Sequence, residues 1–436
     1  MNIFVDLAYL AAIVAISPMA IYRMLRHGRY RAGWANRFGH INRKYADKKC
    51  IWIHAVSVGE VNATTTIVRE LENKFPDYEI VISTTTDTGF ARANVLFGDR
   101  LCVFYFPMDF SVTMGRAFEN IRPSVILLIE LEVWPNLVRI ARRSNIPVVV
   151  VNGRISERSF GKYKLIRPVM RKIFEGVTLV LAQSDEYAER FRQLGAAEKV
   201  KVIGSLKYDT AQVADKVEKA DELAAQLGLK NERLWVAGAT GDGEEQIILD
   251  VYRRLIEQKQ FEDLRLAIVP RKPERFNEVA QLVKQNNLRL VRYSEIKKKV
   301  SGKSSIINYQ LSINTVVLGD TMGDLRKFYS LATVVFVGRT LVPMGGSDMM
   351  EAASLGKCTI FGPHAFNFKQ AVDDLLKGNG AVFVNNGNEL LEALQKCLSD
   401  SNYSAQIANA GQQIIKNNQG ATARTIAHIT KVLKGD

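Results

Sequence analysis

The chain alternates two patterns of hydrophobic residues. Short runs are apolar at every position, and the longer segments between them repeat apolar residues every three or four positions. A strand buried on both faces is apolar throughout, so the short runs predict strands of parallel sheets and the segments between them predict helices. The predicted strands lie at 51–56, 79–83, 101–106, 125–129, 148–151, 179–182 and 200–203, and then at 234–238, 266–270, 315–318, 334–338, 358–361 and 381–384. This alternation predicts an α/β protein with two Rossmann-like, doubly wound parallel sheets.

A change of pattern near 204–210 divides the chain into two predicted domains. The last strand of the first half gives way there to a polar stretch, and an Ala- and Glu-rich helix is expected from Asp215. A length of 436 residues is enough for two domains with separate cores. We therefore assign residues 23–207 to an N-terminal domain and residues 208–436 to a C-terminal domain. The lysine-rich segment at 297–305 predicts a surface loop within the second domain.

Residues 1–22 form a further element, because the stretch 3–21 contains Asp6 as its only charged residue. A helix of this length reaches roughly 28 Å, close to the thickness of a bilayer core. It is followed by arginines without intervening acids, at positions 23, 26, 29, 31 and 37. By the positive-inside rule these arginines keep the rest of the chain on the cytoplasmic side. The segment predicts a membrane-anchor helix, spanning or interfacial, and the interruption at Ser17-Pro18 leaves a core helix as the alternative.

The net charge of +14 favours anionic partners, such as phosphorylated metabolites, lipid headgroups or nucleic acid. Nucleic acid is not an expected partner, because the chain has no helix-turn-helix, RRM or KH signature. The cysteines are far apart and lack neighbouring histidine clusters, at Cys50, Cys102, Cys358 and Cys397. We therefore expect a reducing compartment and no structural zinc.

Acidic residues follow two predicted strands of the first half, at the strand ends where parallel sheets carry their chemistry. Glu60 comes after a glycine turn and begins a helix predicted to continue to residue 74. A carboxylate at a helix N-terminus is also a common stabilising feature, so Glu60 alone is weak evidence of a site. Glu130 and Glu132 leave a second buried strand, and this pair is harder to explain by stability. His54 lies inside a strand and is interpreted as a core histidine or a support for the site.

Glycine-rich turns and cations follow strands of the second half. The segments 237–245, 319–323 and 338–346 each precede a helix and offer backbone N–H groups where an anion could bind. Neither a Walker A loop nor a dinucleotide fingerprint is present in the first of them. Arg271 ends another strand and is suited to clamp a phosphate. Together these features predict a nucleotide site in which Glu351 could accept hydrogen bonds from ribose hydroxyls.

Six spaced motifs occur in one order along the chain. They are Ser57-Val58-Gly59-Glu60, Glu130-Leu131-Glu132-Val133-Trp134-Pro135-Asn136, Gly204-Ser205-Leu206-Lys207-Tyr208-Asp209, Val269-Pro270-Arg271, Gly319-Asp320-Thr321-Met322-Gly323 and Gly362-Pro363-His364-Ala365-Phe366-Asn367-Phe368. In these motifs the chain resembles, nearly end to end, the 3-deoxy-D-manno-octulosonic acid (Kdo) transferases of lipopolysaccharide synthesis. The resemblance implies an inverting glycosyltransferase of the GT-B type on the cytoplasmic side of the inner membrane. It would move Kdo from CMP-Kdo to the phosphorylated lipid A precursor, lipid IVA.

The resemblance also implies roles for particular residues. Glu60 matches the general base of the family, and Glu130 matches the first acid of its second motif, which would stabilise the transition state or orient the acceptor. The donor contacts carried over are Arg271, Met322, Gly323, Glu351, Asn367 and Lys369. CMP-Kdo is then a substrate, and neither a cofactor nor a metal is expected. A basic stretch between Arg154 and Lys172 is expected either to meet the membrane surface and the acceptor phosphates or to form an ordinary solvated helix face.

Departures from the family pattern fall in the predicted donor domain. Ser347-Asp348-Met349-Met350 stands where the family has His-Asn-Pro-Leu, and Gly241 and Lys272 replace two histidines. Asp348 therefore adds a carboxylate near the predicted nucleotide site. One alternative is a GT-B transferase or an epimerase that uses a different nucleotide sugar. Another is a membrane-associated nucleotide-binding protein without catalytic activity, against which the retention of Glu60 and Arg271 argues.

Overall fold

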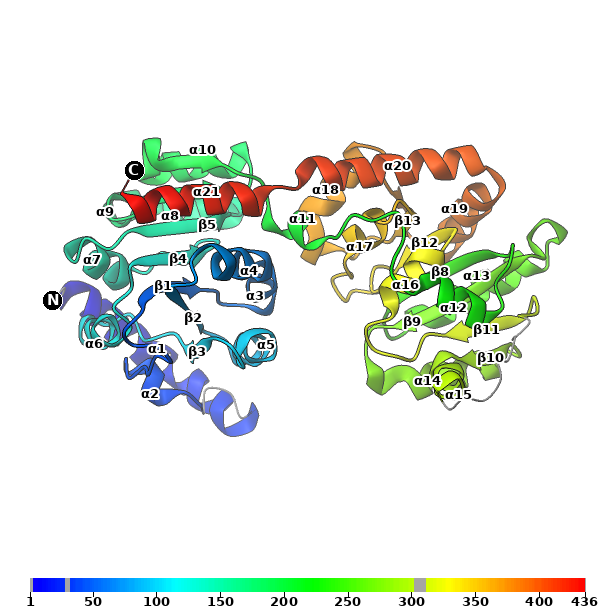
Figure 1. Cartoon of the computed structure of the whole chain (residues 1–436), viewed down its shortest axis with the longest axis horizontal. Coiled ribbons are helices and arrows are strands. Elements are labelled where there is room, and N and C mark those ends of the chain that lie inside the picture. The colour runs from blue at the N-terminus through cyan, green and yellow to red at the C-terminus, as the bar shows by residue number, and fades with distance from the viewer. Residues whose placement is uncertain (1–2, 28–31, 302–310, 436) are drawn as a thin grey trace. The chain divides into compact units, whose positions relative to one another are not determined.

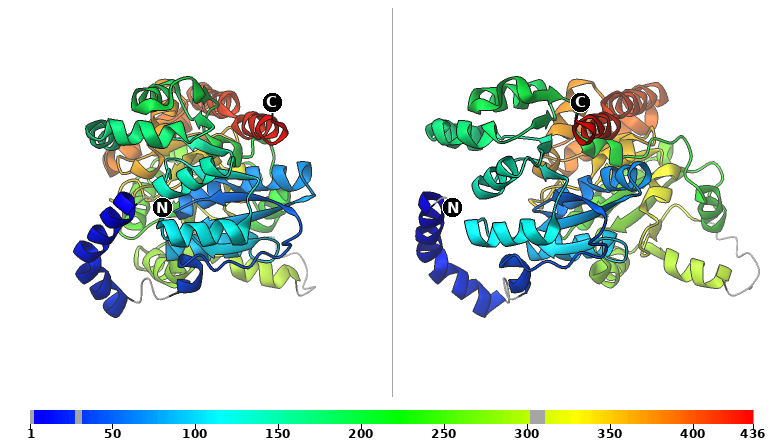
Figure 2. Two further views of the ribbon diagram at one scale, coloured as in Figure 1. Left: turned by 90° about the vertical axis from the view of Figure 1, so that its left-hand side faces the viewer. Right: turned by 60° about the vertical axis from the view of Figure 1, so that its left-hand side comes forward.

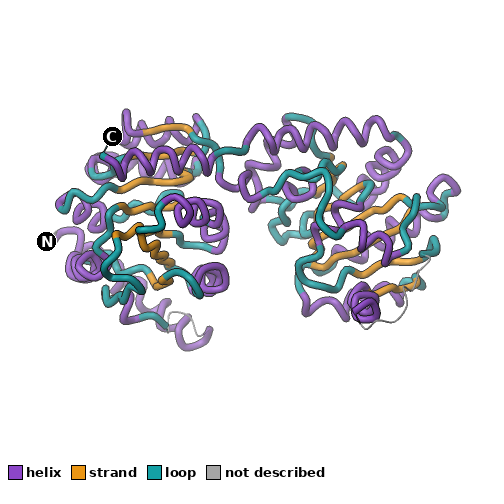
Figure 3. The backbone as a smooth tube through the Cα atoms, viewed as in Figure 1, coloured by secondary structure: helices purple, strands orange, loops and turns teal. Residues whose placement is uncertain are grey.

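The structure is a computed structural model that describes residues 3–27, 32–301 and 311–435. It consists of two compact units, each with a parallel sheet flanked by helices (Figures 1 and 3). The first unit holds Met1–Thr210 and Asn418–Asp436, and the second holds Ala211–Asn417. The prediction of two α/β units with parallel sheets is confirmed.

The sheet of the first unit has seven parallel strands in the order β3-β2-β1-β4-β5-β6-β7. Its strands are β1 (Lys49–His54), β2 (Tyr78–Thr84), β3 (Cys102–Tyr105), β4 (Val125–Ile129), β5 (Val148–Gly153), β6 (Leu179–Ala182) and β7 (Val200–Val202). The connecting helices are α3 (Val58–Ala63), α4 (Thr65–Lys74), α5 (Asp87–Phe97), α6 (Ser111–Ile121), α7 (Pro135–Arg143), α8 (Glu157–Leu165), α9 (Arg167–Glu175) and α10 (Asp185–Phe191). The single helix predicted from residue 61 to 74 is thus divided at Thr64.

Both faces of this sheet are covered, as the apolar runs predict. Ile126 and Leu128 of β4 belong to one hydrophobic cluster, whereas Leu127 and Ile129 belong to the cluster on the opposite face. All four side chains are almost completely buried. Successive strand residues point to opposite faces, so a strand with helices on both sides needs apolar residues at every position.

The second sheet also has seven parallel strands, in the order β10-β11-β9-β8-β12-β13-β14. Its strands are β8 (Arg233–Thr240), β9 (Leu264–Pro270), β10 (Arg289–Arg292), β11 (Thr315–Leu318), β12 (Val334–Val337), β13 (Cys358–Phe361) and β14 (Val382–Phe383). The principal helices are α12 (Ala220–Leu227), α13 (Glu244–Ile256), α14 (Phe276–Gln285), α15 (Tyr293–Ser301), α16 (Leu325–Leu331), α17 (Met349–Ala353), α18 (Lys369–Lys377), α19 (Gly387–Ser399) and α20 (Ser401–Asn418).

Two local predictions in this unit are wrong. Strand β10 was not predicted, because it is an edge strand with an arginine at each end and lacks a continuous apolar run. The lysines at 297–299 lie in α15 and not in a loop. The remainder of that predicted loop, 302–305, lies outside the described residues.

The C-terminal segment corrects the predicted domain boundary. Residues 418–436 belong to the first unit, although the sequence pattern assigned them to the second. Helix α21 (Ala421–Lys434) buries Ala421 and Ile429 in the same cluster as Leu206, which begins the short helix α11 (Leu206–Thr210). The carboxylate of Asp209 accepts hydrogen bonds from the backbone N–H groups of Gly420, at 2.7 Å, and of Thr422. These contacts attach the end of the chain to the first sheet.

The predicted N-terminal helix is present as α1 (Ile3–His27), at the outside of the first unit (Figure 2). None of the helices within residues 3–27, 32–301 and 311–435 is both long and apolar enough to span a bilayer. Asp6 of α1 accepts hydrogen bonds from Ser111 N (3.0 Å) and Asn136 Nδ2 (2.9 Å). The hydroxyl of Tyr9 donates to Asp109 at 2.9 Å.

The arginines behind α1 have different surroundings. Arg29 and Arg31 lie outside the described residues. Arg37 is the last residue of the short helix α2 (Trp34–Arg37). It stacks over the ring of Tyr105, with its guanidinium carbon 4.6 Å from the ring centre. Arg37 is therefore part of the folded first unit.

Candidate functional site

The topology of the first sheet brings the predicted acidic residues together. The strand order reverses between β1 and β4, which are neighbours in the sheet although β2 and β3 intervene in sequence. Ligands of open α/β sheets bind outside the carboxyl ends of the strands at such a reversal. Glu60 follows β1, and Glu130 and Glu132 follow β4. All three carboxylates therefore lie at the reversal point of the first sheet.

Glu60 lies in the first turn of α3, where the sequence places it. Its carboxylate accepts hydrogen bonds from the backbone N–H of Val56 at 2.9 Å and from the hydroxyl of Ser57 at 2.8 Å. Ser57 caps the helix by accepting from Glu60 N, so Glu60 has the stabilising role expected of a helix N-terminus as well. Burial raises the pKa of Glu60, the two hydrogen bonds oppose this rise, and the nearby charge of Glu130 adds to it.

Glu130 forms the turn after β4 in an unusual backbone conformation. Its φ is 60°, in the left-handed region that side chains other than glycine rarely adopt. Its backbone N–H donates to Val151 O at 2.9 Å and so continues the pairing of β4 with β5. Within the described part of the chain, the carboxylate of Glu130 makes no hydrogen bond or ion pair with another residue. Strained backbone of this kind is typical of functional turns.

Glu132 is a site residue that the sequence prediction did not select. Its carboxylate accepts a hydrogen bond from Trp134 Nε1 at 3.1 Å and lies 4.0 Å from Nε2 of His54. Burial, together with the charges of Glu60 and Glu130, raises the pKa of Glu132 to about 7. In the sequence Glu130 and Glu132 look equivalent. The signal that could have distinguished Glu132 was His54, which lies buried on the neighbouring strand β1.

Five adjacent strands of the second sheet, β11, β9, β8, β12 and β13, present the predicted donor loops at one edge. The loop after β9 carries Arg271, which is exposed and makes no side-chain hydrogen bond or ion pair within the described residues. Arg275, by contrast, pairs with Glu245 at 2.6 Å and Glu278 at 2.8 Å. Arg271 and its neighbour Lys272, which is also exposed and unpaired within the described residues, are therefore the cations of this loop that are open to an anion.

Glu351 lies in α17, where it is half-buried. Burial raises the pKa of Glu351, the nearby Asp348 raises it further, and the charges of Arg326 and Arg271 lower it. Asp348, the extra carboxylate of this chain, caps α17 by accepting from Met350 N at 3.0 Å. Arg271 and Asp348 therefore both lie close enough to Glu351 for their charges to act on its carboxylate.

The other predicted donor residues lie on separate loops of the same unit. Met322 is 70% exposed, and Gly323 has a φ of 86° with open space around it. They form a turn before α16 and not its first residues, because the helix begins at Leu325. The side chain of Asn367 lies against Gly345 on the loop after β12, where a Cβ would clash with it. Lys369 begins α18 and forms an ion pair with Asp373 at 2.6 Å.

The glycine-rich loop after β8 differs from its prediction as an open anion site. The buried carboxylate of Glu244 accepts hydrogen bonds from the N–H groups of Gly241 (3.3 Å), Arg339 (2.5 Å), Thr340 (2.9 Å) and Leu341 (2.9 Å). The loops after β8 and β12 are thus joined by a carboxylate of the protein itself. The N–H groups of Gly241 and of residues 339–341 are therefore already bonded and are not open to an anion.

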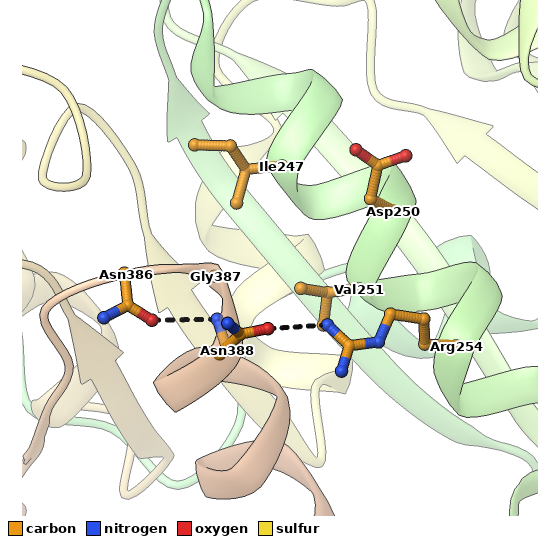
Figure 4. Close-up of a pocket in the computed structure, with 7 residues that line it drawn as sticks. All are labelled: Ile247, Asp250, Val251, Arg254, Asn386, Gly387 and Asn388. Atoms are coloured by element: carbon orange, nitrogen blue, oxygen red, sulfur yellow. Dashed lines mark hydrogen bonds between the residues drawn. The ribbon is translucent and has the colours of Figure 1, made fainter.

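Two further features do not add to the site. An open pocket of the second unit lies between α13 and the start of α19, with Arg254 Nη1 donating to Asn388 Oδ1 at 2.8 Å, and contains none of the predicted residues (Figure 4). Among the described residues, no group of three or more histidine, cysteine or acidic side chains could hold a metal ion.

Comparisons with known proteins agree with the motifs. A family model described as 3-deoxy-D-manno-octulosonic-acid transferase matches residues 32–210, and one described as glycosyl transferases group 1 matches residues 241–414. The 3-deoxy-D-manno-octulosonic acid transferase of Haemophilus influenzae is 34% identical over 91% of this chain and 91% of that protein. The enzyme of the same name from Bordetella pertussis is 29% identical over 96% of this chain and 97% of that protein.

Solved structures support the fold. The S. aureus MnaA–UDP complex matches with a TM-score of 0.54 and 15% identity, covering 88% of this chain and 97% of that chain. At this identity the likeness shows the fold alone. The family models and the relative from Haemophilus influenzae show that the chain is a glycosyltransferase and belongs to the 3-deoxy-D-manno-octulosonic-acid transferase family.

Proposed function

We propose that this enzyme transfers Kdo from CMP-Kdo to the phosphorylated lipid A precursor, lipid IVA, with inversion at the anomeric carbon. The observation that carries the proposal is the meeting of Glu60 and Glu130 at the reversal point of the first sheet, in a chain of this family. A carboxylate with a raised pKa at such a point is suited to general base catalysis.

Glu60 acts as the general base. Its carboxylate takes the proton from the primary hydroxyl of the acceptor as the hydroxyl oxygen attacks the anomeric carbon of Kdo. The bond from that carbon to the phosphate oxygen breaks, and CMP leaves with the bonding electrons. Glu130, whose carboxylate is not engaged with the described residues, stabilises the positive charge that develops on the sugar or orients the acceptor.

Donor binding belongs to the second unit. The exposed guanidinium of Arg271 and the N–H groups of the Met322-Gly323 turn neutralise the phosphate of CMP, so the reaction needs neither metal nor cofactor. Glu351 accepts hydrogen bonds from the ribose, and Asn367 and Lys369 are further donor contacts. Support comes from the shared electrostatic neighbourhood of Arg271 and Glu351.

The enzyme acts on the cytoplasmic side of the inner membrane, attached at the interface. Helix α1 uses Asp6 and Tyr9 to bind the first unit and leaves Leu7, Leu10 and Val14 more than half exposed. The α8–α9 corner adds the exposed apolar residues Leu165, Ile166 and Val169 among basic residues. Exposed apolar side chains beside cations favour an anionic lipid surface.

Mass spectrometry of the acceptor tests the proposal. Tetraacyl bis-phosphorylated lipid A precursor is incubated with the protein and with CMP-Kdo regenerated in place. The wild type is expected to add one or more Kdo units, and Glu60→Ala is expected to add none while still binding CMP. Full activity of Glu60→Ala would remove Glu60 as the base.

The second candidate is transfer of a different nucleotide-linked sugar, favoured by Asp348 beside Glu351. Binding of a panel of nucleotides by calorimetry separates the two candidates. Preference for CMP supports Kdo transfer, whereas preference for UDP supports the alternative.

A further inference from the structure

His54 has a buried ring nitrogen without a hydrogen-bond partner. The side chain is completely buried in β1, and its ring is stacked on Phe106 with the ring centres 3.9 Å apart. Its Nδ1 lies 3.1 Å from the carbonyl oxygen of Ser83 and 3.0 Å from the hydroxyl of Ser83. Its Nε2 has no hydrogen bond and faces Glu132 Oε2 at 4.0 Å. An unpaired buried polar atom is costly, so this contact needs an explanation.

The carbonyl contact of Nδ1 favours this nitrogen as the one that carries the proton. A lone pair on Nδ1 would oppose the lone pairs of the Ser83 carbonyl, whereas an N–H at Nδ1 can donate to that carbonyl. Burial lowers the pKa of His54 to about 3, so the ring is neutral near pH 7. A neutral ring protonated at Nδ1 presents an acceptor at Nε2.

Glu132 faces this acceptor nitrogen and lies among other acidic groups. Glu60 on α3, Glu130 in the turn after β4 and Tyr163 on α8 all interact electrostatically with Glu132. Trp134 donates its indole N–H to Glu132. None of these groups is a cation, so nothing among them compensates an additional negative charge. An ionised Glu132 would set its lone pairs against that of Nε2, but a carboxylic acid can donate to it.

We propose that Glu132 is held as a neutral carboxylic acid by the buried His54, so that Glu60 carries the negative charge of the site. A shift of roughly 1.2 Å would bring the O–H of Glu132 to hydrogen-bond length from Nε2. Glu132 and His54 are then positioning residues: the pair retains one proton and thereby prevents repulsion between adjacent carboxylates from raising the proton affinity of the base. The inference rests on the proposed role of Glu60.

The two substitutions of the pair have different consequences for the base. Glu132→Gln keeps a neutral donor toward Nε2, so the acidic limb of the kcat/KM profile is expected to stay at its wild-type pH, because Glu132 is already uncharged where Glu60 ionises. His54→Phe preserves the ring stacking but removes the acceptor, so Glu132 loses its proton more readily and the limb moves to higher pH by about half to one unit. The double variant is expected to follow Glu132→Gln, because the partner of His54 no longer titrates.

Two measurements test the pair without substrate. Nitrogen NMR of the full-length protein, with the His54 signals assigned by their loss in His54→Phe, is expected to show a neutral ring protonated at Nδ1. Infrared difference spectra between acidic and alkaline pH are expected to show a protonated carboxyl band that is absent in Glu132→Gln. Glu119→Gln, an exposed glutamate of α6, is the matched control and should leave the band and the pH profile unchanged.

The outcomes separate this inference from the proposed function. A ring protonated at Nε2, or an infrared band unchanged by Glu132→Gln, would overturn the pair. Glu132→Gln that is folded but inactive at every pH would also overturn it, because an ionised Glu132 would then be required. If the wild type transfers no Kdo while both spectra are as expected, the pair stands and the proposed function fails.

Discussion

The two units place carboxylates at corresponding edges of their sheets but surround them differently. Near the predicted donor loops, Asp324 is 3% exposed and accepts hydrogen bonds from Lys297, Lys327 and Thr321. These donors outweigh burial and lower the pKa of Asp324 to about 2. Glu132 in the first unit receives one indole N–H and two neighbouring carboxylates, and its pKa rises to about 7.

Burial alone therefore does not distinguish a structural carboxylate from a reactive one. The number of donors and the sign of the neighbouring charges decide whether a buried acid keeps or loses its proton at neutral pH. Glu244, at the strand reversal of the second sheet, makes the same point with neutral donors, since four backbone N–H groups bind it. In the first unit Glu60 has two donors and Glu132 has one, and burial together with the neighbouring carboxylates raises the pKa of both acids.

The largest expected effect comes from removing Glu244. Glu244→Ala leaves four backbone N–H groups without a partner in the loops after β8 and β12, and should cost about 3–5 kcal/mol of unfolding free energy. Chemical denaturation measures this loss, and Glu257→Ala, an exposed acid just after α13, should change stability by less than about 0.5 kcal/mol. A loss below about 1 kcal/mol for Glu244→Ala would contradict its structural role.

The two perturbed acids should respond to pH with opposite signs. The pKa of Asp324 falls from 3.8 to about 2 on folding, so its contribution is present above pH 4 and disappears as pH falls toward 2. Asp324→Asn should therefore lose about 2 kcal/mol at pH 6 and much less at pH 2.5.

The pKa of Glu132 rises from 4.5 to about 7, so its burial destabilises the fold progressively as pH rises from about 4.5 to 7 and by a constant amount above pH 7. Glu132→Gln should therefore be more stable than the wild type at pH 7–8, and this difference should shrink as pH falls toward 4.5. Chemical denaturation measures the free energy of unfolding of Asp324→Asn and Glu132→Gln relative to the wild type. The comparison would be contradicted if both substitutions changed this free energy with the same sign.

The smallest effect is expected for the contact between α1 and the first unit. Tyr9→Phe removes the hydroxyl that donates to Asp109, which keeps its bonds from the backbone N–H groups of Asn136 and Leu137. The loss should be about 1 kcal/mol. Tyr22→Phe, an exposed position of the same helix, is the matched control, and an equal change in both variants would show that the Asp109 contact is not specific.

The sequence predicted the sheets well because both are buried on two faces. Strands such as β4 and β13 are apolar at every position and were located to the residue. Strand β10 was missed because an edge position tolerates arginines. The return of α21 to the first unit could not be predicted, since an amphipathic helix pattern does not specify the sheet on which the helix packs.

The acidic site was predicted in part for similar reasons. Glu60 and Glu130 follow strands and are visible as a pattern, but the role of Glu132 depends on the left-handed turn at Glu130 and on a histidine of the next strand. The glycine-rich loop after β8 was misjudged because Glu244 lies immediately behind its glycines. Whether that acid turns back to bind the loop depends on the distant segment 339–341.

The most direct test separates the chemistry of the first unit from the donor binding of the second. Glu60→Gln and Arg271→Ala are compared by calorimetry with CMP and by single-turnover transfer from CMP-Kdo. Glu60→Gln should bind CMP like the wild type and transfer Kdo about 100- to 10,000-fold more slowly, whereas Arg271→Ala should lose roughly tenfold or more in CMP affinity. Rapid transfer by Glu60→Gln, or unchanged CMP affinity in Arg271→Ala, would contradict the division of labour between the two units.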